Sequence, residues 1–297
     1  MTLLVTVVIT THDRRELLAE SLASVLAQDW PRLEVVVVDD AGRDGTWAWL
    51  EQCADPRVKP LRLTTNTGFP GARNAGLAAA RGELVLFLDD DDLLLPTAVH
   101  RLAAALARAL QATAATGVEL GFDGAERWLN CIRPRRPLVR DVWPDVLAGL
   151  WITGAGRTLF RTDVLRRAGG WDESVRFGED DELWLRLAPR GPVAVVPDDV
   201  LLYRSHTNRA RPPDAKRTER AFRRRFVDGA PVVRGRRGRR LLHAWEHIDD
   251  AGTALAADRP GWAAVRYAAA LVHASELLAS PFSRLALLPA LAAKPCS

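Results

Sequence analysis

Apolar residues in the first part of the chain gather in short runs, which are separated by stretches with helical spacing. The runs are Leu3–Thr10, Leu33–Val38, Val58–Leu63 and Glu83–Leu88. A continuous β-branched run such as Leu33–Val38 is typical of a strand that is buried on both faces of a parallel sheet. We therefore predict four successive strands of a mostly parallel sheet.

Between and after these runs, apolar residues recur every three or four positions, which indicates helices that pack one face on the sheet. The predicted helices are Arg15–Ala27, Thr46–Cys53, Ala72–Ala80 and a helix from Pro96 to about Leu110. Repeated strand and helix units of this kind predict an α/β fold, with a central sheet flanked by helices.

The second half of the chain carries a weaker pattern. Three prolines divide residues Thr116–Trp151, so only short strands and loops are expected there. Farther along, we predict strands at Thr158–Phe160 and Val193–Val196 and helices at Arg161–Ala168, Glu179–Ala188, Leu241–Leu255 and Trp262–Leu278. The last two helices are Ala-rich and form a C-terminal appendage, for which covering the core is favoured over a dimer interface or a membrane contact.

These patterns divide the chain into an α/β domain at residues 1–206, a basic linker or loop at 207–240 and the helical appendage at 241–297. A length of 297 residues with 48% hydrophobic content suits such a globular protein. The three cysteines show no metal or disulfide spacing. This cysteine usage fits a reducing cytoplasm, and neither a signal peptide nor a membrane-spanning run is evident.

Positive charge is concentrated in one segment, although the formal net charge is only +4. Between Arg204 and Arg240 there are fourteen Lys and Arg residues against three acidic ones. Such a segment attracts phosphate-bearing partners or an anionic membrane surface, and a solvated linker is the plain alternative. We expect peripheral contact with the inner face of the plasma membrane and no nucleic acid partner.

Four consecutive aspartates, Asp89 to Asp92, follow the fourth predicted strand. Adjacent carboxylates at the end of a buried strand either raise one another's pKa or require a cation. Period-two alternation places Asp89 and Asp91 on one side and Asp90 on the other. The sequence therefore favours a site for Mg²⁺ or Mn²⁺. The alternative is that Asp92 or a neighbour caps the helix near Pro96 while the others are solvated.

Two further polar clusters end predicted strands, namely Thr10–Asp13 and Asp39-Asp40. In open α/β sheets ligands bind outside the carboxyl ends of the strands, so these clusters and the four aspartates predict a nucleotide site. A carboxylate there is placed to accept hydrogen bonds from a base or ribose, and Arg73 offers donors to phosphate or base. The chain lacks both GxGxxG and GxxxxGK[ST], which argues against a dinucleotide-binding domain and a P-loop enzyme.

Five segments, in this order, closely resemble family 2 glycosyltransferases of the GT-A fold. They are Val7–Arg14, Val36–Asp40, Gly71–Gly76, Phe87–Asp92 and Gly178–Arg186. The resemblance covers about residues 3–206 and implies a nucleotide-diphospho-sugar transferase fold. It says little about the substrate.

By position, the resemblance also implies roles on the donor side. Thr10 and Asp40 line the nucleoside pocket, Arg73 lies near the base or phosphates, and Asp90 touches the ribose or the sugar. The outer positions of the family's DxD motif fall on Asp89 and Asp91, of which Asp91 is the favoured direct metal ligand.

On the acceptor side, the resemblance selects Asp180 as the catalytic base. Helix-dipole effects alone also favour acids at the start of a helix, so the residues by themselves do not choose among positions 179–182. Gly154, Trp171 and Glu179 belong to the acceptor side, where Trp171 either stacks on a sugar ring or packs in the core.

Two histidines add detail to the resemblance. His206 matches a residue that approaches the metal or the pyrophosphate in many relatives, although a lone histidine is more often structural. His12 stands where relatives often carry tyrosine, so stacking against the base is in doubt.

The expected function is therefore transfer of a sugar, with inversion, from a nucleotide diphosphate sugar to an acceptor hydroxyl in the biosynthesis of surface polysaccharide or glycoconjugate. UDP-sugar is the default donor. A growing glycan, a lipid-linked saccharide or a small molecule is the acceptor. The alternatives are a sugar-1-phosphate nucleotidyltransferase, whose Gly-rich loop after the first strand is missing here, and a non-catalytic nucleotide-sugar-binding relative.

Overall fold

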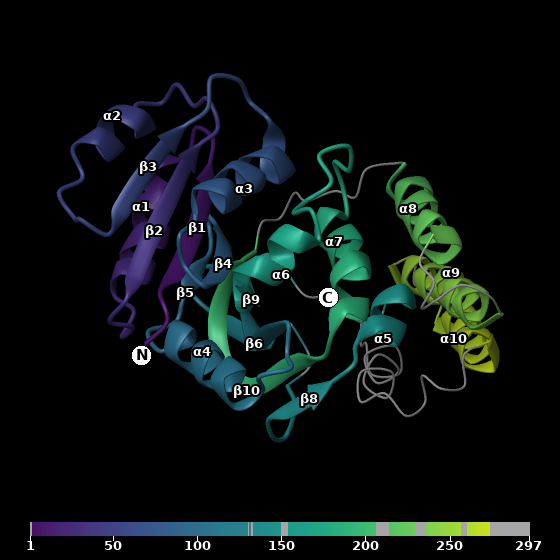
Figure 1. Ribbon diagram of the computed structural model, residues 1–297. Coiled ribbons are helices and arrows are strands. Elements are labelled where there is room, and N and C mark those ends of the chain that lie inside the picture. The colour runs from purple at the N-terminus through teal and green to yellow at the C-terminus, as the bar shows by residue number, and fades with distance from the viewer. Residues whose placement is uncertain are drawn as a thin grey trace.

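The computed structural model describes residues 2–129, 131, 133–149, 154–205, 214–229, 236–256 and 260–273 (Figure 1). The strands are β1 (Val5–Thr11), β2 (Leu33–Asp39), β3 (Val58–Arg62), β4 (Leu84–Asp89), β5 (Leu93–Leu94), β6 (Ala114–Phe122), β7 (Arg127–Leu129), β8 (Leu138–Arg140), β9 (Thr158–Arg161) and β10 (Val193–Arg204). The helices are α1 (Arg15–Leu26), α2 (Thr46–Glu51), α3 (Gly68–Ala79), α4 (Ala98–Arg108), α5 (Trp143–Leu147), α6 (Thr162–Arg167), α7 (Glu179–Leu187), α8 (Ala215–Gly229), α9 (Arg236–Ala256) and α10 (Pro260–His273).

Within the described residues all ten strands belong to one sheet, whose main path runs β3-β2-β1-β4-β9-β6-β10-β5. The half formed by β3, β2, β1 and β4 is parallel, as the sequence predicts. In the register of this half, Thr11 lies beside Asp39 and Thr10 lies beside Asp89. The carboxyl ends of three strands therefore meet at one edge and present their polar residues together.

The second half of the sheet differs from the expectation in two places. Ala114–Phe122 is a nine-residue strand, β6, in a region where only short strands and loops were predicted. Its alanines and glycines give a weak β pattern, but pairing with β9 on one side and β10 on the other fixes it. The strand β10 also runs past Val196 to Arg204, through register shifts between Val195 and Leu201 that explain why the pattern breaks there.

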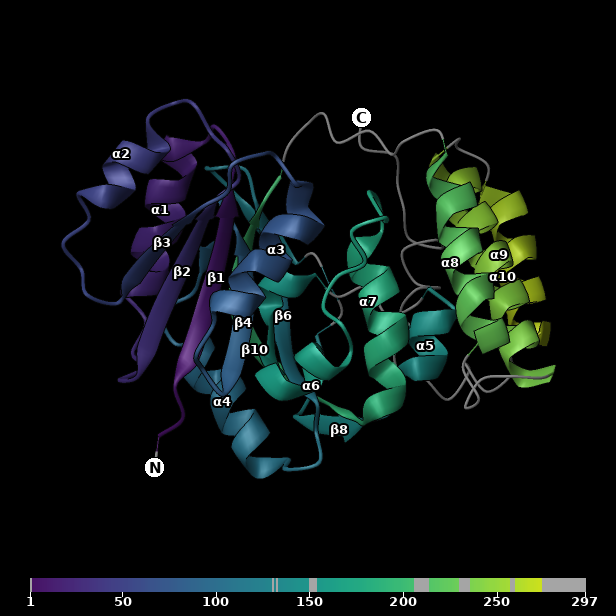
Figure 2. The same ribbon diagram turned by 45° about the horizontal axis from the view of Figure 1, so that its top comes forward.

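Helices cover both faces of the sheet, as Figure 2 shows. On one face, Val7, Ile9 and Val35 pack in a core with residues of α1 and α4. On the other face, Val8 and Val36 pack in a core with residues of α3, α5 and α7. Burial of alternate residues on opposite faces explains why β1, β2 and β4 are apolar along most of their length.

The helix α3 lies unusually close to the sheet at Gly76. A Cβ atom at this position would lie 2.3 Å from Cγ1 of Val8. Only glycine therefore allows the helix to approach β1 at this distance. The contact fixes the helix that begins just beyond the ligand edge of the sheet.

The C-terminal part of the chain contains more helix than expected. The segment 207–240 was predicted to be a linker or loop, but α8 occupies Ala215–Gly229 and α9 begins at Arg236. The high share of arginine obscured an amphipathic helix, whose Phe222 and Val227 are buried in the core beside α7. Leu241 and Trp245 of α9 join the same core. In the described part of the chain, no helix has the length and apolar character needed to cross a bilayer.

Candidate active site

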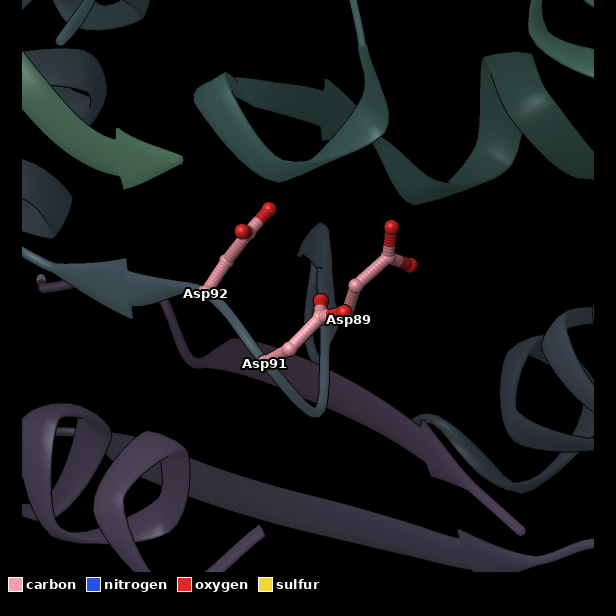
Figure 3. A group of neighbouring side chains, drawn as sticks. All are labelled: Asp89, Asp91 and Asp92. Atoms are coloured by element: carbon pink, nitrogen blue, oxygen red, sulfur yellow. The ribbon is translucent and has the colours of Figure 1, made fainter. Parts of the chain in front are cut away.

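A tight turn after β4 gathers three of the four aspartates. The backbone N–H of Asp92 donates to the carbonyl of Asp89 at 3.2 Å, and β5 begins directly afterwards. Carboxylate oxygens of Asp89, Asp91 and Asp92 all lie within 4.8 Å of one another. Figure 3 shows the three side chains rising on the same side of the turn.

The turn is held from the last strand of the sheet. The backbone N–H of Arg204 donates to Oδ1 of Asp92 at 2.9 Å, and its Nε donates to the carbonyl of Asp91 at 2.9 Å. Asp92 is therefore not a helix cap, because β5 separates it from α4 and its carboxylate faces β10. This geometry excludes a capping role for Asp92 and shows that Asp92 belongs to the acidic cluster.

Asp90 lies apart from the other three and lines a neighbouring pocket, as strand alternation predicts. Arg14, which the sequence analysis did not select, joins the two groups. Its Nη1 lies 3.2 Å from Oδ1 of Asp90 and 2.9 Å from Oδ2 of Asp91. The signal for Arg14 was its position directly after the polar end of the first strand.

Burial and mutual repulsion alter the ionisation of these acids. Burial raises the pKa of Asp90 to about 6, with the charges of Asp91 and Asp89 adding to the rise and Arg14 opposing it. Burial also holds the pKa of Asp92 well above its usual range, and the nearby charge of Asp89 adds to that effect. A cation that entered this cluster would relieve both penalties.

The donor set fits a hard divalent cation. All three groups offer carboxylate oxygens, which Mg²⁺ and Mn²⁺ prefer. An octahedral ion with oxygens at about 2.1 Å keeps them at most about 4.2 Å apart, so small side-chain adjustments would close the cluster around it. Asp89, Asp91 and Asp92 are therefore the residues that could hold such an ion.

The pocket beside the turn has a volume of about 250 Å³ and is lined by Thr10, Thr11, His12, Arg14, Asp40, Asn66, Gly68, Phe69, Ala72 and Asp90. The hydroxyl of Thr10 is buried and has no hydrogen-bond partner among the described residues. Phe69 exposes its ring at the pocket, whereas Nδ1 of His12 lies 2.7 Å from the carbonyl oxygen of Asp40. Polar groups and an exposed aromatic ring suit a nucleoside.

Asp40 also fixes the start of α3. One of its oxygens accepts from the N–H and hydroxyl of Thr67, at 2.8 and 3.0 Å, and the other accepts from the N–H of Gly68 at 2.9 Å. A carboxylate offers about four acceptor sites, so some capacity remains for a ligand. The residue thus connects the end of β2 to the helix that carries Arg73.

Arg73 joins the acidic turn to the start of α7. Its Nη2 donates to Asp89 at 2.8 Å, and its Nη1 lies 3.1 Å from Asp180 and 3.4 Å from Glu179. Burial lowers the pKa of Arg73, but the three negative charges outweigh this effect and leave the pKa raised. The sequence placed Arg73 near a donor's base or phosphates, and the structure adds that its side chain bridges the carboxylates.

The four acids that open α7 have different partners. Asp181 accepts a hydrogen bond from Arg223 at 2.9 Å, and Glu182 forms an ion pair with Arg186. Neither acid therefore faces Arg73. Glu179 does lie beside Arg73, and burial together with the charge of Asp180 raises the pKa of Glu179 to about 7. These contacts leave Glu179 and Asp180 as the two acids of this helix that face the acidic turn.

Asp180 is positioned by three donors. Arg73 and the indole N–H of Trp171 donate to Oδ1, at 3.1 and 3.2 Å, and the backbone N–H of Ala155 donates to Oδ2 at 3.3 Å. Its side chain is 26% exposed, so a reactant can still approach it. The arrangement orients a carboxylate without enclosing it.

Of the two roles that the sequence left open for Trp171, the structure shows packing in the core and not a free ring for a sugar. The residue is only 2% exposed and packs edge-to-face on Phe87, with ring centroids 4.4 Å apart. Core packing, the other possibility left open by the sequence, is the observed role, and the indole N–H reaches Asp180. Gly154 precedes Ala155 and is half-buried beside this carboxylate. His206, the third expected metal ligand, lies outside the described residues.

Comparison with known proteins agrees with this geometry. Residues 6–165 match the sequence model of the family described as "Glycosyl transferase family 2". The chain is 30% identical to an uncharacterized protein of Mycobacterium tuberculosis, over 69% of this chain and 67% of that protein. It is 35% identical to the succinoglycan biosynthesis protein ExoO of Rhizobium meliloti, over 41% of this chain but only 33% of that protein. The chain thus spans about a third of the length of that relative.

Among solved structures, the chain is similar to residues 1–349 of TarS from S. aureus in complex with UDP. The TM-score is 0.70 at 20% sequence identity, with 97% of this chain and 88% of that chain covered. The same protein in complex with UDP-GlcNAc gives a TM-score of 0.69. At this level of identity the likeness establishes the fold, which is that of a GT-A glycosyltransferase.

Proposed function

The chain belongs to glycosyl transferase family 2, and from this membership we propose that it transfers a sugar from a nucleotide diphosphate sugar to a hydroxyl group of an acceptor. One observation carries the proposal. The cluster of Asp89, Asp91 and Asp92 lies beside a nucleoside-sized pocket, and Arg73 connects Asp89 to the partly exposed carboxylate of Asp180. Family membership also favours this function over that of a nucleotidyltransferase.

On the donor side, we assign the nucleoside to the pocket that contains Thr10, Asp40 and Asp90. The unpartnered hydroxyl of Thr10 and the remaining acceptor capacity of Asp40 supply polar contacts, and Phe69 supplies a ring face. Uridine is the proposed base, because the fold is shared with a protein whose structures contain UDP and UDP-GlcNAc. Arg14 and Arg73 flank the acidic turn and are placed to contact the diphosphate.

Cleavage of the donor leaves negative charge on the diphosphate. We propose that Asp89 and Asp91, with Asp92, hold Mg²⁺ or Mn²⁺, which would supply electrostatic stabilisation of that charge when bound. The residues of the chain contribute by orienting the turn, since Arg204 fixes both Asp91 and Asp92. Arg14 adds a second positive group at the same place.

On the acceptor side, we assign the role of general base to Asp180. Its carboxylate is oriented by Arg73, Trp171 and Ala155, and it takes the proton of the attacking hydroxyl. Attack on the face opposite the nucleotide inverts the anomeric centre in a single displacement. Glu179 lies beside this base and assists in shaping the acceptor side.

The acceptor class is proposed from the named relative and from the charge of the chain. A protein of succinoglycan biosynthesis points to surface polysaccharide or glycoconjugate, either as a growing glycan or as a lipid-linked saccharide. The Arg-rich segment around α8 suits peripheral contact with an anionic membrane on its cytoplasmic side. A small-molecule acceptor is the remaining possibility.

A panel of nucleotide sugars tests the proposal. We expect one UDP-sugar to raise the melting temperature in the presence of Mn²⁺ and not with EDTA, because a ligand stabilises the folded state by mass action. The same donor should then be consumed when candidate acceptors are added. Stabilisation by a nucleoside triphosphate and a sugar phosphate, with release of pyrophosphate, would instead identify a nucleotidyltransferase. Binding of a donor without any turnover would identify a non-catalytic relative.

A further inference from the structure

Arg223 of α8 is an arginine with its side chain only 1% exposed, and the function proposed above assigns it no role. Its Nη2 donates to Oδ2 of Asp181 at 2.9 Å, and its Nη1 donates to the carbonyls of Val146 and Leu147, at 2.6 and 3.1 Å. The guanidinium carbon lies 5.1 Å from the ring centroid of Trp245. The buried side chain of Arg223 therefore connects α8 to three other helices, α5, α7 and α9.

The contacts of Arg223 reach the residue beside the candidate base and the end of α5. Asp181 directly follows Asp180 on the first turn of α7. The carbonyls of Val146 and Leu147 close the end of α5, where a positive charge is favourable to the helix dipole. Arg223 thus fixes the residue next to Asp180 in α7 and ties it to the end of α5.

Other contacts of α8 reinforce the same turn. Gly178, which precedes α7, has a φ of +74°, and a Cβ atom there would lie 3.4 Å from Glu219 and 3.5 Å from the ring of Phe222. Arg225 lies 2.8 Å from Asp172 and 3.6 Å from Glu182. The helix is therefore packed against the start of α7 along several residues, before and after the position of Asp180.

We propose that Arg223 is a positioning residue for the transfer reaction, and that α8 is the brace that holds the first turn of α7 in its catalytic geometry. The inference rests on the proposed role of Asp180. It assigns a function to α8, a helix of the basic segment for which the sequence suggested only partner binding or a solvated linker. The polar contacts of Arg223 are internal, so its role does not depend on a partner.

The planar guanidinium matters as well as the charge. Arginine presents five donors in a fixed fork, and here the fork reaches a carboxylate and two carbonyls that belong to different elements. A lysine offers a single point charge and cannot span the same three acceptors in one geometry. Arg223→Lys should therefore preserve the charge but not the position of Asp180.

The test compares Arg223→Lys and Arg223→Met with Arg220→Met. Arg220 lies on the same helix but forms an exposed ion pair with Glu246, so its loss should leave catalysis unchanged. We expect kcat for sugar transfer to fall on the order of 10²-fold in both Arg223 variants, the scale expected for a misplacement of about 1 Å. The KM for the donor and calorimetric binding of UDP with Mn²⁺ should remain close to wild type, since the donor pocket lies on other elements.

A merely structural role predicts a different result. Activity would then fall only in proportion to the folded fraction, and kcat per folded molecule in either variant would equal that of the wild type, which would overturn the proposal. If Arg223→Met does not fold, Asp181→Asn breaks the same contact from α7 and carries the same expectation. Failure of the wild-type protein to transfer sugar from any donor would instead refute the proposed function itself.

Discussion

Two runs of four acidic residues meet at the candidate site, and their negative charges are compensated differently. In the run 179–182, the last two acids have arginine partners that do not contact the acidic turn, Arg223 of α8 for Asp181 and Arg186 of α7 for Glu182. In the run 89–92, three carboxylates face one another, and burial raises the pKa of Asp92. Both runs thus have arginine partners, but only the run 89–92 gathers three carboxylates closely enough for a cation to bind between them.

The largest expected effect follows from loss of the proposed base, which should affect the transfer step and not donor binding. Asp180→Asn should lower the rate of transfer on the order of 10² or more, because a positioned base is lost, while donor binding survives. Steady-state kinetics and calorimetry with the donor would measure both. The matched control is Asp163→Asn, an exposed acid that also lies in the first turn of a helix. Wild-type turnover in Asp180→Asn would rule out this residue as the base.

The second effect concerns the acidic turn. Asp91→Asn should weaken metal-dependent donor binding by about tenfold or more, since even indirect partners of a metal ligand alter affinity by about 10–100-fold. Titration of the donor with and without Mn²⁺ isolates the metal-dependent part. Asp123→Asn, an exposed acid in a loop, is the control. Equal affinities in the variant and the wild type would show that Asp91 is not a ligand.

The third prediction concerns how the stability of the protein depends on pH, since each acidic run contains a group with a raised pKa. The pKa of Asp90 is about 6 and that of Glu179 about 7 in the folded protein, above their ordinary values. The folded state therefore binds more protons than the unfolded state between about pH 4 and pH 7, and the stability of the metal-free protein should fall as pH rises through this range. We expect a loss on the order of 1–3 kcal/mol, measured by urea titration at pH 5.5 and pH 8.

Two further measurements check the origin of this slope. Glu179→Gln should reduce the slope without abolishing it, because the neutral amide has no proton to lose while Asp90 still titrates. Mn²⁺ should stabilise the protein more at pH 8 than at pH 5.5, since the aspartates must be ionised to hold a cation. A metal effect that is larger at the lower pH would contradict the assignment of the carboxylate cluster.

The smallest effect is expected where an acid is neutralised internally. Arg186→Met would leave the buried carboxylate of Glu182 without its bidentate partner, so unfolding should become easier by about 1–2 kcal/mol. The kcat of the folded enzyme should change little, because Glu182 does not face Arg73. Urea titration and kinetics on the same sample distinguish stability from catalysis. A large loss of kcat at unchanged stability would show that the two acidic runs are not separated in this way.

Much of this site could be predicted from sequence because its residues follow strands directly. The ends of β1, β2 and β4 share one edge, so Thr10, Asp40 and Asp89 come together as soon as a parallel sheet is assumed. Asp92 was harder to place, since a turn rather than strand alternation sets its direction. Period-two alternation stops where the strand stops.

Residues that act across long distances in sequence left no local signal. Trp171 reaches Asp180 from a loop, and its burial depends on Phe87 of β4. Arg223 sits among many arginines, and only the packed structure shows that its side chain points inward. The strand β6 was hidden for a similar reason, because its pairing partners rather than its own residues define it.

The hydrogen bonds from Arg204 to the acidic turn have a consequence for folding during translation. The bond from its N–H to Asp92 spans 112 residues, so the turn is completed only after the tenth strand has emerged from the ribosome and docked. A nascent chain that ends earlier has the aspartates but not the strand that orients two of them. The proposed cation site is therefore completed late in translation, once β10 has joined the sheet.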